Sequence, residues 1–175
     1  TDNLKRIVLD KKDIFSIRST ALKVIIESKC RVNLSAILNT LLKFDDADSL
    51  RLIMEAFQHL NFENIEDEFI VDTVISYAGK EQSVIGVLYS VERTLPEHRI
   101  SNILDLLTNS LTKLGKWHDR AGDYELTDFS HHLILRNLQS TSVSPERVWA
   151  WLSPLCGSQC SNLKELSSFI DDKKE

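Results

Sequence analysis

Two cysteines near the end of the chain are the residues whose spacing most resembles a metal half-site. Cys156 and Cys160 are separated by three residues, which is within the range of structural zinc sites. Such a site needs two more ligands, and the best donors are the adjacent histidines His131 and His132. A helix points adjacent side chains about 100° apart, so both could rarely reach one ion. We therefore predict that the chain has no metal site.

Catalytic chemistry finds no support in the spacing of the reactive residues. A nucleophile needs an oriented base beside it, and the three cysteines and five histidines select no such pair. His118 and Asp119 follow Trp117 in a polar stretch, but being sequence neighbours does not make them a dyad. The glycines lack the spacing of a phosphate-binding loop or a dinucleotide fingerprint. We predict a protein that is not an enzyme and holds no cofactor.

Length and composition favour one helical domain. A chain of 175 residues suits a single domain, which we expect to span 1–175. Five glycines and three prolines are few chain breakers, whereas an all-β fold needs a turn about every 8–12 residues. Leucine and isoleucine dominate the apolar residues, which also favours helices. The predicted fold class is all-α.

Three further features concern the context of the chain. It begins with Thr1 and not with methionine, so we expect a fragment of a larger protein. An odd number of cysteines at low density favours a reducing compartment, so we expect the cytoplasm or the nucleus. No run of about 18 uncharged apolar residues is present, so we expect no membrane span.

The elements that would position any site are predicted from apolar residues that recur with the 3.6-residue period of a helix. Six such faces fall within residues 17–26, 34–42, 50–60, 70–78, 84–95 and 100–114, and three shorter ones within 126–138, 148–155 and 163–170. This pattern predicts about nine helices, with the longest loop at 115–125.

Residues at the ends of these faces indicate where the helices begin and end. Gly79 and Gly115 follow apolar faces, where a residue in the left-handed conformation commonly ends a helix. Asn33 and Asp48 are placed to cap helix N-termini with their side-chain oxygens. The sequence 144–146, Ser-Pro-Glu, has a capping serine, a proline at the first position and an acid near the positive helix end.

The helical segments also repeat. Residues 36–44 (AILNTLLKF) align with residues 69–77 (FIVDTVISY) at an offset of 33, so that Ile37 matches Ile70, and a further 33 residues lead to Ile103. A two-helix unit repeated every 33 residues predicts stacked antiparallel helical hairpins of the α-solenoid type. The repeat-like part would cover 14–115, followed by C-terminal helices within 126–171. An irregular helical bundle is the alternative.

On this pattern the chain resembles the α–α helical repeat superfamily, closest to HEAT or armadillo-like arrays. The Trp-Leu-Gly-Tyr pattern of tetratricopeptide repeats and the Thr-Pro-Leu-His pattern of ankyrin repeats are absent. The resemblance implies a scaffold that holds partners along an extended surface. We therefore expect a protein–protein interaction or scaffold domain. The alternatives are an accessory or regulatory helical domain of an enzyme, and a nucleic-acid-binding helical repeat.

Charge is distributed unevenly along the chain. Residues 1–44 carry nine basic and four acidic side chains, a net charge of +5. Residues 45–72 carry nine acids and one basic residue, Arg51, a net charge of −8. The acids that stand out form two clusters at the starts of predicted helices: Asp45, Asp46 and Asp48, then Glu63, Glu66, Asp67 and Glu68.

Two interpretations of these clusters remain open. Acids at helix starts stabilise the positive helix end. Alternatively, they form an acidic edge that attracts a basic protein partner by long-range steering. Nucleic acid is a poorer fit as a partner, because the sequence pI is about 5.6 and nucleic-acid-binding domains are usually basic.

Overall fold

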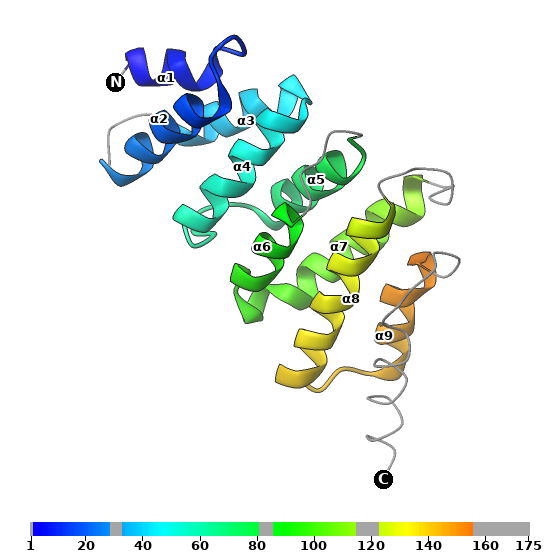
Figure 1. The fold of residues 1–175 in the computed structure, drawn as a ribbon. Helices are drawn as coiled ribbons and strands as arrows, with labels where there is room; N and C mark the ends of the chain where they lie inside the picture. The colour runs from blue at the N-terminus through cyan, green and yellow to red at the C-terminus, as the bar shows by residue number, and fades with distance from the viewer. Residues whose placement is uncertain (1, 29–32, 81–85, 115–122, 156–175) are drawn as a thin grey trace.

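The computed structural model describes residues 2–28, 33–80, 86–114 and 123–155, and every regular element in these ranges is a helix. The elements are α1 (Asp2–Leu9), α2 (Phe15–Glu27), α3 (Leu34–Phe44), α4 (Ala47–His59), α5 (Asp67–Ala78), α6 (Val87–Thr94), α7 (Glu97–Leu114), α8 (Asp123–Ser140), α9 (Pro145–Leu152) and the short 3₁₀ helix η1 (Ser153–Leu155) (Figure 1). The predicted all-α class is confirmed.

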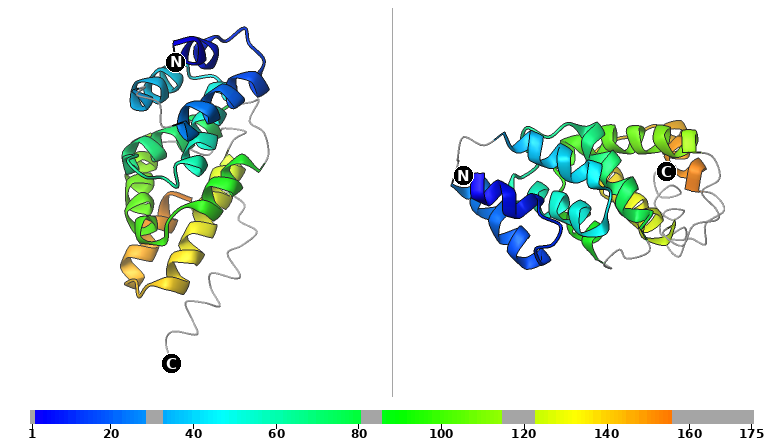
Figure 2. Two further views of the ribbon diagram at one scale, coloured as in Figure 1. Left: turned by 90° about the vertical axis from the view of Figure 1, so that its left-hand side faces the viewer. Right: turned by 90° about the horizontal axis from the view of Figure 1, so that it is seen from above.

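The helices pack mainly against neighbours that are one or two positions away in the chain. Helix α2 packs on α4, α4 on α6, and α6 on α8, while α1 packs on α3, α5 on α7, and α7 on α9. Contacts between consecutive helices, such as α1 with α2 and α3 with α4, join these two sets. The molecule is elongated, with α1 and α9 at opposite ends (Figure 2).

One hydrophobic core runs along the molecule and takes up the apolar faces. Ile37, Ile70 and Ile103, which the 33-residue offset aligns, are all at most 1% exposed. The central helix α4 buries the most, since Leu50, Leu52, Ile53, Met54, Ala56 and Phe57 are all fully inaccessible. None of the helices in the described ranges combines the length and the apolar character needed to cross a membrane.

Several helix boundaries differ from those predicted. Helix α1 was missed, because its eight residues show no long apolar face. Helix α6 starts at Val87, and Gly86 precedes it in the left-handed conformation (φ 92°) instead of lying inside a longer helix. Helix α8 begins at Asp123, within the segment expected to be loop. The segments 115–122 and 156–175, with Cys156, Cys160, His118, Gly115 and the face at 163–170, lie outside the described residues.

The capping predictions were partly wrong. Asn33 and Ser144 do cap α3 and α9, each accepting a hydrogen bond from a backbone N–H three residues ahead. For α4 the cap is Asp46 and not Asp48. Gly79 follows α5 with a φ of −75°, whereas a non-glycine residue, Asp45 (φ 50°), takes the left-handed position after α3.

Candidate partner-binding surface

The first acidic cluster lies at the turn between α3 and α4, and two of its three members are engaged within the chain. Asp46 accepts hydrogen bonds from the Ser49 N–H (2.9 Å) and hydroxyl (3.0 Å) and pairs with Lys11 Nζ (2.8 Å). Partial burial would raise the pKa of Asp46, but the bonds from Lys11 and Ser49 outweigh it and lower that pKa. Asp45 pairs with Lys80 at 2.7 Å. Asp48, in the first turn of α4, is exposed and forms no side-chain bond within the described residues.

The second cluster lies at the turn between α4 and α5, where one acid differs from the rest. Asp67 accepts hydrogen bonds from Arg99 Nε (2.7 Å) and from the Asn102 amide, both on α7. The other three acids of the cluster are exposed and make no ion pair in the described ranges: Glu63, Glu66 and Glu68. Asp67 therefore joins α5 to α7, whereas the three glutamates face solvent.

Arg99 also fixes the backbone of this turn. Its guanidinium donates to the carbonyl oxygens of Phe62 (2.6 Å) and Ile65. The backbone lies in the left-handed region at Asn61, Phe62 and Asn64, where φ is 48°, 61° and 56°. Residues that carry a Cβ atom disfavour this conformation. Phe62 is nevertheless buried. The turn that presents the three glutamates is thus held in one shape from α7.

The two clusters lie on opposite edges of the molecule. Helix α4 begins at the first cluster and ends at the second, and its 13 residues span about 20 Å. One compact partner site cannot therefore use both clusters through short contacts. The larger group of unpaired acids is the one at the α4–α5 turn, which we call the acidic turn (Glu63, Glu66 and Glu68).

Another polar cluster lies between α6 and α8, and no spacing of residues predicted it. Glu92 is buried, and its Oε2 lies 3.0 Å from His132 Nδ1. Asp128 Oδ2 lies 3.8 Å from the same nitrogen. Burial raises the pKa of Glu92, although the neighbouring His132 opposes the shift. The available signal was that Glu92 lies about one helical turn from both Leu88 and Leu95, on the apolar side of α6.

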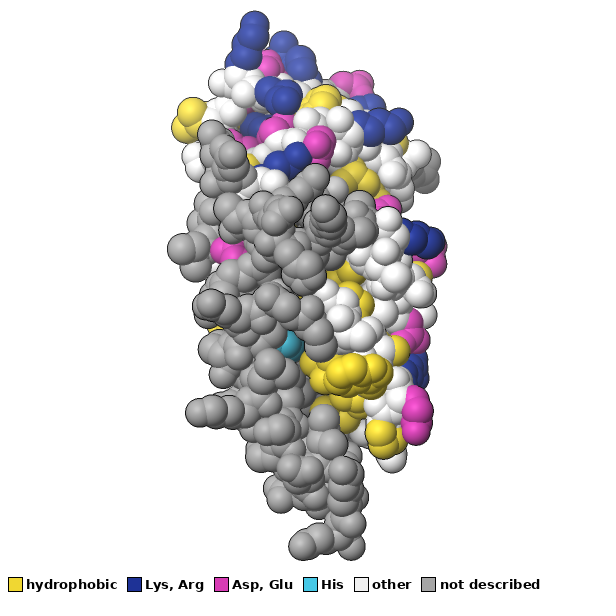
Figure 3. All heavy atoms as spheres, turned by 90° about the vertical axis from the view of Figure 1, so that its right-hand side faces the viewer, with side chains coloured by type: hydrophobic (Ala, Val, Ile, Leu, Met, Phe, Trp, Pro, Cys, Tyr) yellow, Lys and Arg dark blue, Asp and Glu magenta, His cyan; other side chains and the backbone are white. Residues whose placement is uncertain are grey.

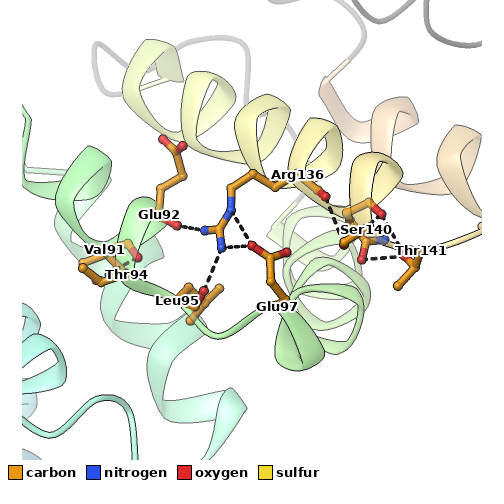
Figure 4. A network of polar contacts seen from close by, with 9 residues as sticks. Val91, Glu92, Thr94, Leu95, Glu97, Arg136, Ser140 and Thr141 are labelled. Atoms are coloured by element: carbon orange, nitrogen blue, oxygen red, sulfur yellow. Dashed lines mark hydrogen bonds and ion pairs between the residues drawn. The ribbon is translucent and has the colours of Figure 1, made fainter.

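Arg136 of α8 fastens the same region from the other side. Its guanidinium lies between the carbonyl oxygens of Glu92 and Leu95 and the carboxylate of Glu97 (Figure 4). The Leu95 bond is 3.0 Å, and that from Nε to Glu97 is 3.1 Å. One side chain thus holds the end of α6 and the start of α7 against α8, as Arg99 holds the α4–α5 turn against α7.

The two histidines considered as metal donors lie in different surroundings. His132 faces Glu92, while His131 is 1% exposed and its Nε2 has no hydrogen-bond partner among the residues that the structure describes. Within the described part of the chain, no three side chains of the types that bind metals converge on one point. Burial lowers the pKa of His131, with the charge of Asp128 acting in the opposite direction.

The buried His131 predicts a loss of stability in acid. The folded chain disfavours the proton that an unfolded histidine binds near its ordinary pKa of about 6.5. Stability is therefore fully present above that pH and falls as the pH drops below it. We expect His131→Leu to reduce the dependence of the free energy of unfolding on pH, as measured by denaturant titrations at several pH values. The matched control His98→Gln, at an exposed histidine of α7, should keep it, and an unchanged dependence on pH in His131→Leu would contradict the assignment.

Apolar side chains are also exposed at both ends of the molecule. Trp149 of α9 is 64% exposed, whereas Trp151 is buried and donates to Asp105 Oδ1 at 2.7 Å. At the other end, Ile14, Ile17 and Val24 are exposed at and along α2. Figure 3 shows hydrophobic side chains gathered on the lower part of one face, at the level of α9.

Comparison with protein-family models, curated proteins and solved structures gave no match to this chain.

Proposed function

We propose that the chain is a protein–protein interaction or scaffold domain, built as an α-solenoid-like repeat of helical hairpins. The observation that supports it is the spacing of the side-chain hydrogen bonds that join helices. Those between two side chains link residues that are 31 to 46 positions apart, from Arg18–Ser49 at one extreme to Asp105–Trp151 at the other, which is about the length of one two-helix unit. Such spacing is expected when each repeat contacts only its neighbours.

The acidic turn is the surface that we propose to receive the partner. Its three glutamates are exposed, and Arg99 fixes the backbone that carries them. A rigid surface loses little conformational freedom on binding, which favours affinity. The unbalanced negative charge favours a partner with a basic surface, which it would attract by long-range electrostatic steering. Asp45, Asp46 and Asp67 contribute less, because each already has a basic partner within the chain.

Charge reversal at the acidic turn tests this proposal. The immobilised domain would be used to capture proteins from cell extract, and the affinity of each purified candidate would then be measured. We expect Glu66→Lys combined with Glu68→Lys to weaken binding of the true partner by about tenfold or more, mainly through slower association. Because both acids lie at the positive end of α5, their reversal is also expected to cost about 1 kcal/mol of stability, and thermal melts check that the domain stays folded.

The control carries the same charge change elsewhere. Asp48→Lys combined with Glu146→Lys also replaces two exposed acids in first helical turns, at α4 and α9. A partner that binds the Glu66/Glu68 variant as well as it binds wild type would remove the acidic turn from the proposal. Equal weakening by the control variant would mean that net charge, and not this turn, governs binding.

A further inference from the structure

The contact between α6 and α8 is centred on a buried carboxylate beside an imidazole. Glu92 is 5% exposed, and only 3.0 Å separates its Oε2 from His132 Nδ1. The Tyr89 ring meets the His132 ring edge-on, with 6.5 Å between their centres, and the Arg93 guanidinium lies over the Tyr89 ring, 5.4 Å from its centre. The pair therefore joins the two helices through a carboxylate that is shielded from water, while 31% of the His132 side chain stays exposed.

The surrounding charges do not neutralise Glu92. From α8, Asp128 adds a second negative charge near His132, and His131 points into the core. Arg136 attracts the Glu92 carboxylate, but its N–H groups donate to two backbone carbonyls and to Glu97 of α7. Neither α4 nor α7, as far as the structure describes them, places a charged side chain in ion-pair contact with Glu92 or His132.

We propose that one proton shared by Glu92 and His132 fastens α6 to α8, and that α6 loosens when this proton is lost at higher pH. With the proton present, the pair is either a carboxylate beside an imidazolium or a carboxylic acid beside a neutral imidazole. Both forms balance the charge inside the contact. Without the proton, a carboxylate stays buried beside a neutral ring and close to Asp128, which is unfavourable.

The direction of the pH effect follows from this arrangement. Burial raises the pKa of the Glu92 carboxyl, so the folded contact holds a proton more tightly than the same carboxyl does in the unfolded chain. The stabilisation is therefore present at lower pH and is lost as the pH rises through the titration of the pair.

Helix α6 is the element expected to respond. It has only eight residues, and no side-chain hydrogen bond caps its N-terminus after Gly86. A helix this short depends on tertiary contacts for its stability.

Amide hydrogen exchange of the full chain tests the proposal. Protection factors for residues 88–95, corrected for intrinsic exchange, would be compared at about pH 6 and about pH 8, with α2 as the internal reference. We expect the protection of α6 relative to α2 to fall by about threefold or more at the higher pH, because the contact that holds the helix is weakened. Protection that does not change relative to α2 would overturn the proposal.

Two variants separate the shared proton from other titrations. Glu92→Gln keeps a polar group beside His132 without its charge, so α6 should stay protected at both pH values. His132→Gln removes the base, so α6 should be weakly protected at both. The control His98→Gln, at an exposed histidine of α7, should retain the wild-type fall. A wild-type fall that persists in either Glu92→Gln or His132→Gln would also overturn the proposal.

Discussion

Replacing Ile37, Ile70 or Ile103 with alanine is expected to lower the free energy of unfolding by about 2–5 kcal/mol in each case. Each side chain is at most 1% exposed, on α3, α5 and α7 respectively. The loss combines the transfer energy of the removed carbons with the cavity left behind. If the 33-residue register is real, the three losses should also be similar, because the three positions would be equivalent. Denaturant titrations of the single variants measure them.

Exposed residues on the same helices provide the contrast. Asn39→Ala and Asp72→Ala should change stability by about 0.5 kcal/mol or less, since both side chains are exposed. Thr73, although polar and on the same helix as Asp72, cannot serve as a control. It is fully buried, and its hydroxyl donates to the Phe69 carbonyl at 2.8 Å. Widely different isoleucine losses would make the register a coincidence and favour the irregular bundle.

The second large effect is expected at Arg99. Replacing it with methionine would remove the donor to the Phe62 and Ile65 carbonyls and leave the Asp67 carboxylate with the Asn102 amide alone. Removing one partner of a fully buried ion pair lowers the free energy of unfolding by about 3–5 kcal/mol. We expect a loss of about 3 kcal/mol for Arg99→Met, because the Arg99 side chain is 15% exposed. The turn should also lose protection from amide exchange, since its disfavoured backbone conformation would no longer be held.

Arg93→Met is the matched control for this change. Arg93 is exposed on α6, and the contacts the structure shows for its side chain are with Tyr89. Its loss should leave both stability and the exchange of residues 61–65 close to wild type. If Arg99→Met behaves in the same way, Arg99 does not hold the turn, and the rigid presentation of the acidic turn loses its basis.

The helices were predictable where an apolar stripe was long enough to show the 3.6-residue period. The segments around Leu50 and Ile100 are examples, since both helices follow the pattern closely. Helix α1 was missed because its apolar residues, Leu4, Ile7 and Val8, cover only two turns, and its packing against α2 and α3 is not visible in so short a pattern. The left-handed conformation of Asp45 was missed because glycine adopts it more easily than aspartate does. The ion pair of Asp45 with Lys80, which lies 35 residues away, accompanies it and could not be seen in the local sequence.

The acidic clusters could be located from sequence, but the state of each acid could not. Asp46 and Asp67 have partners 35 and 32 residues away, at Lys11 and Arg99, and no local pattern reveals such pairs. The distance between the two acidic clusters could be predicted from the sequence, because one predicted helix separates them and its length sets that distance. The pair of Glu92 and His132 depends on how α6 lies against α8, which the periodicity of each helix alone does not specify.

The packing partners of each helix also lie near it along the chain, and this bears on how the protein forms during synthesis. The most widely separated pair in substantial contact is α5 with α8, only three positions apart. Helices α1 to α3 have all their principal partners once α4 has been made. A nascent chain can therefore acquire native structure progressively, starting with its first helices. The apolar faces of these helices do not stay exposed while a distant segment is being made. Such low contact order favours rapid folding and shortens the time in which apolar faces could aggregate.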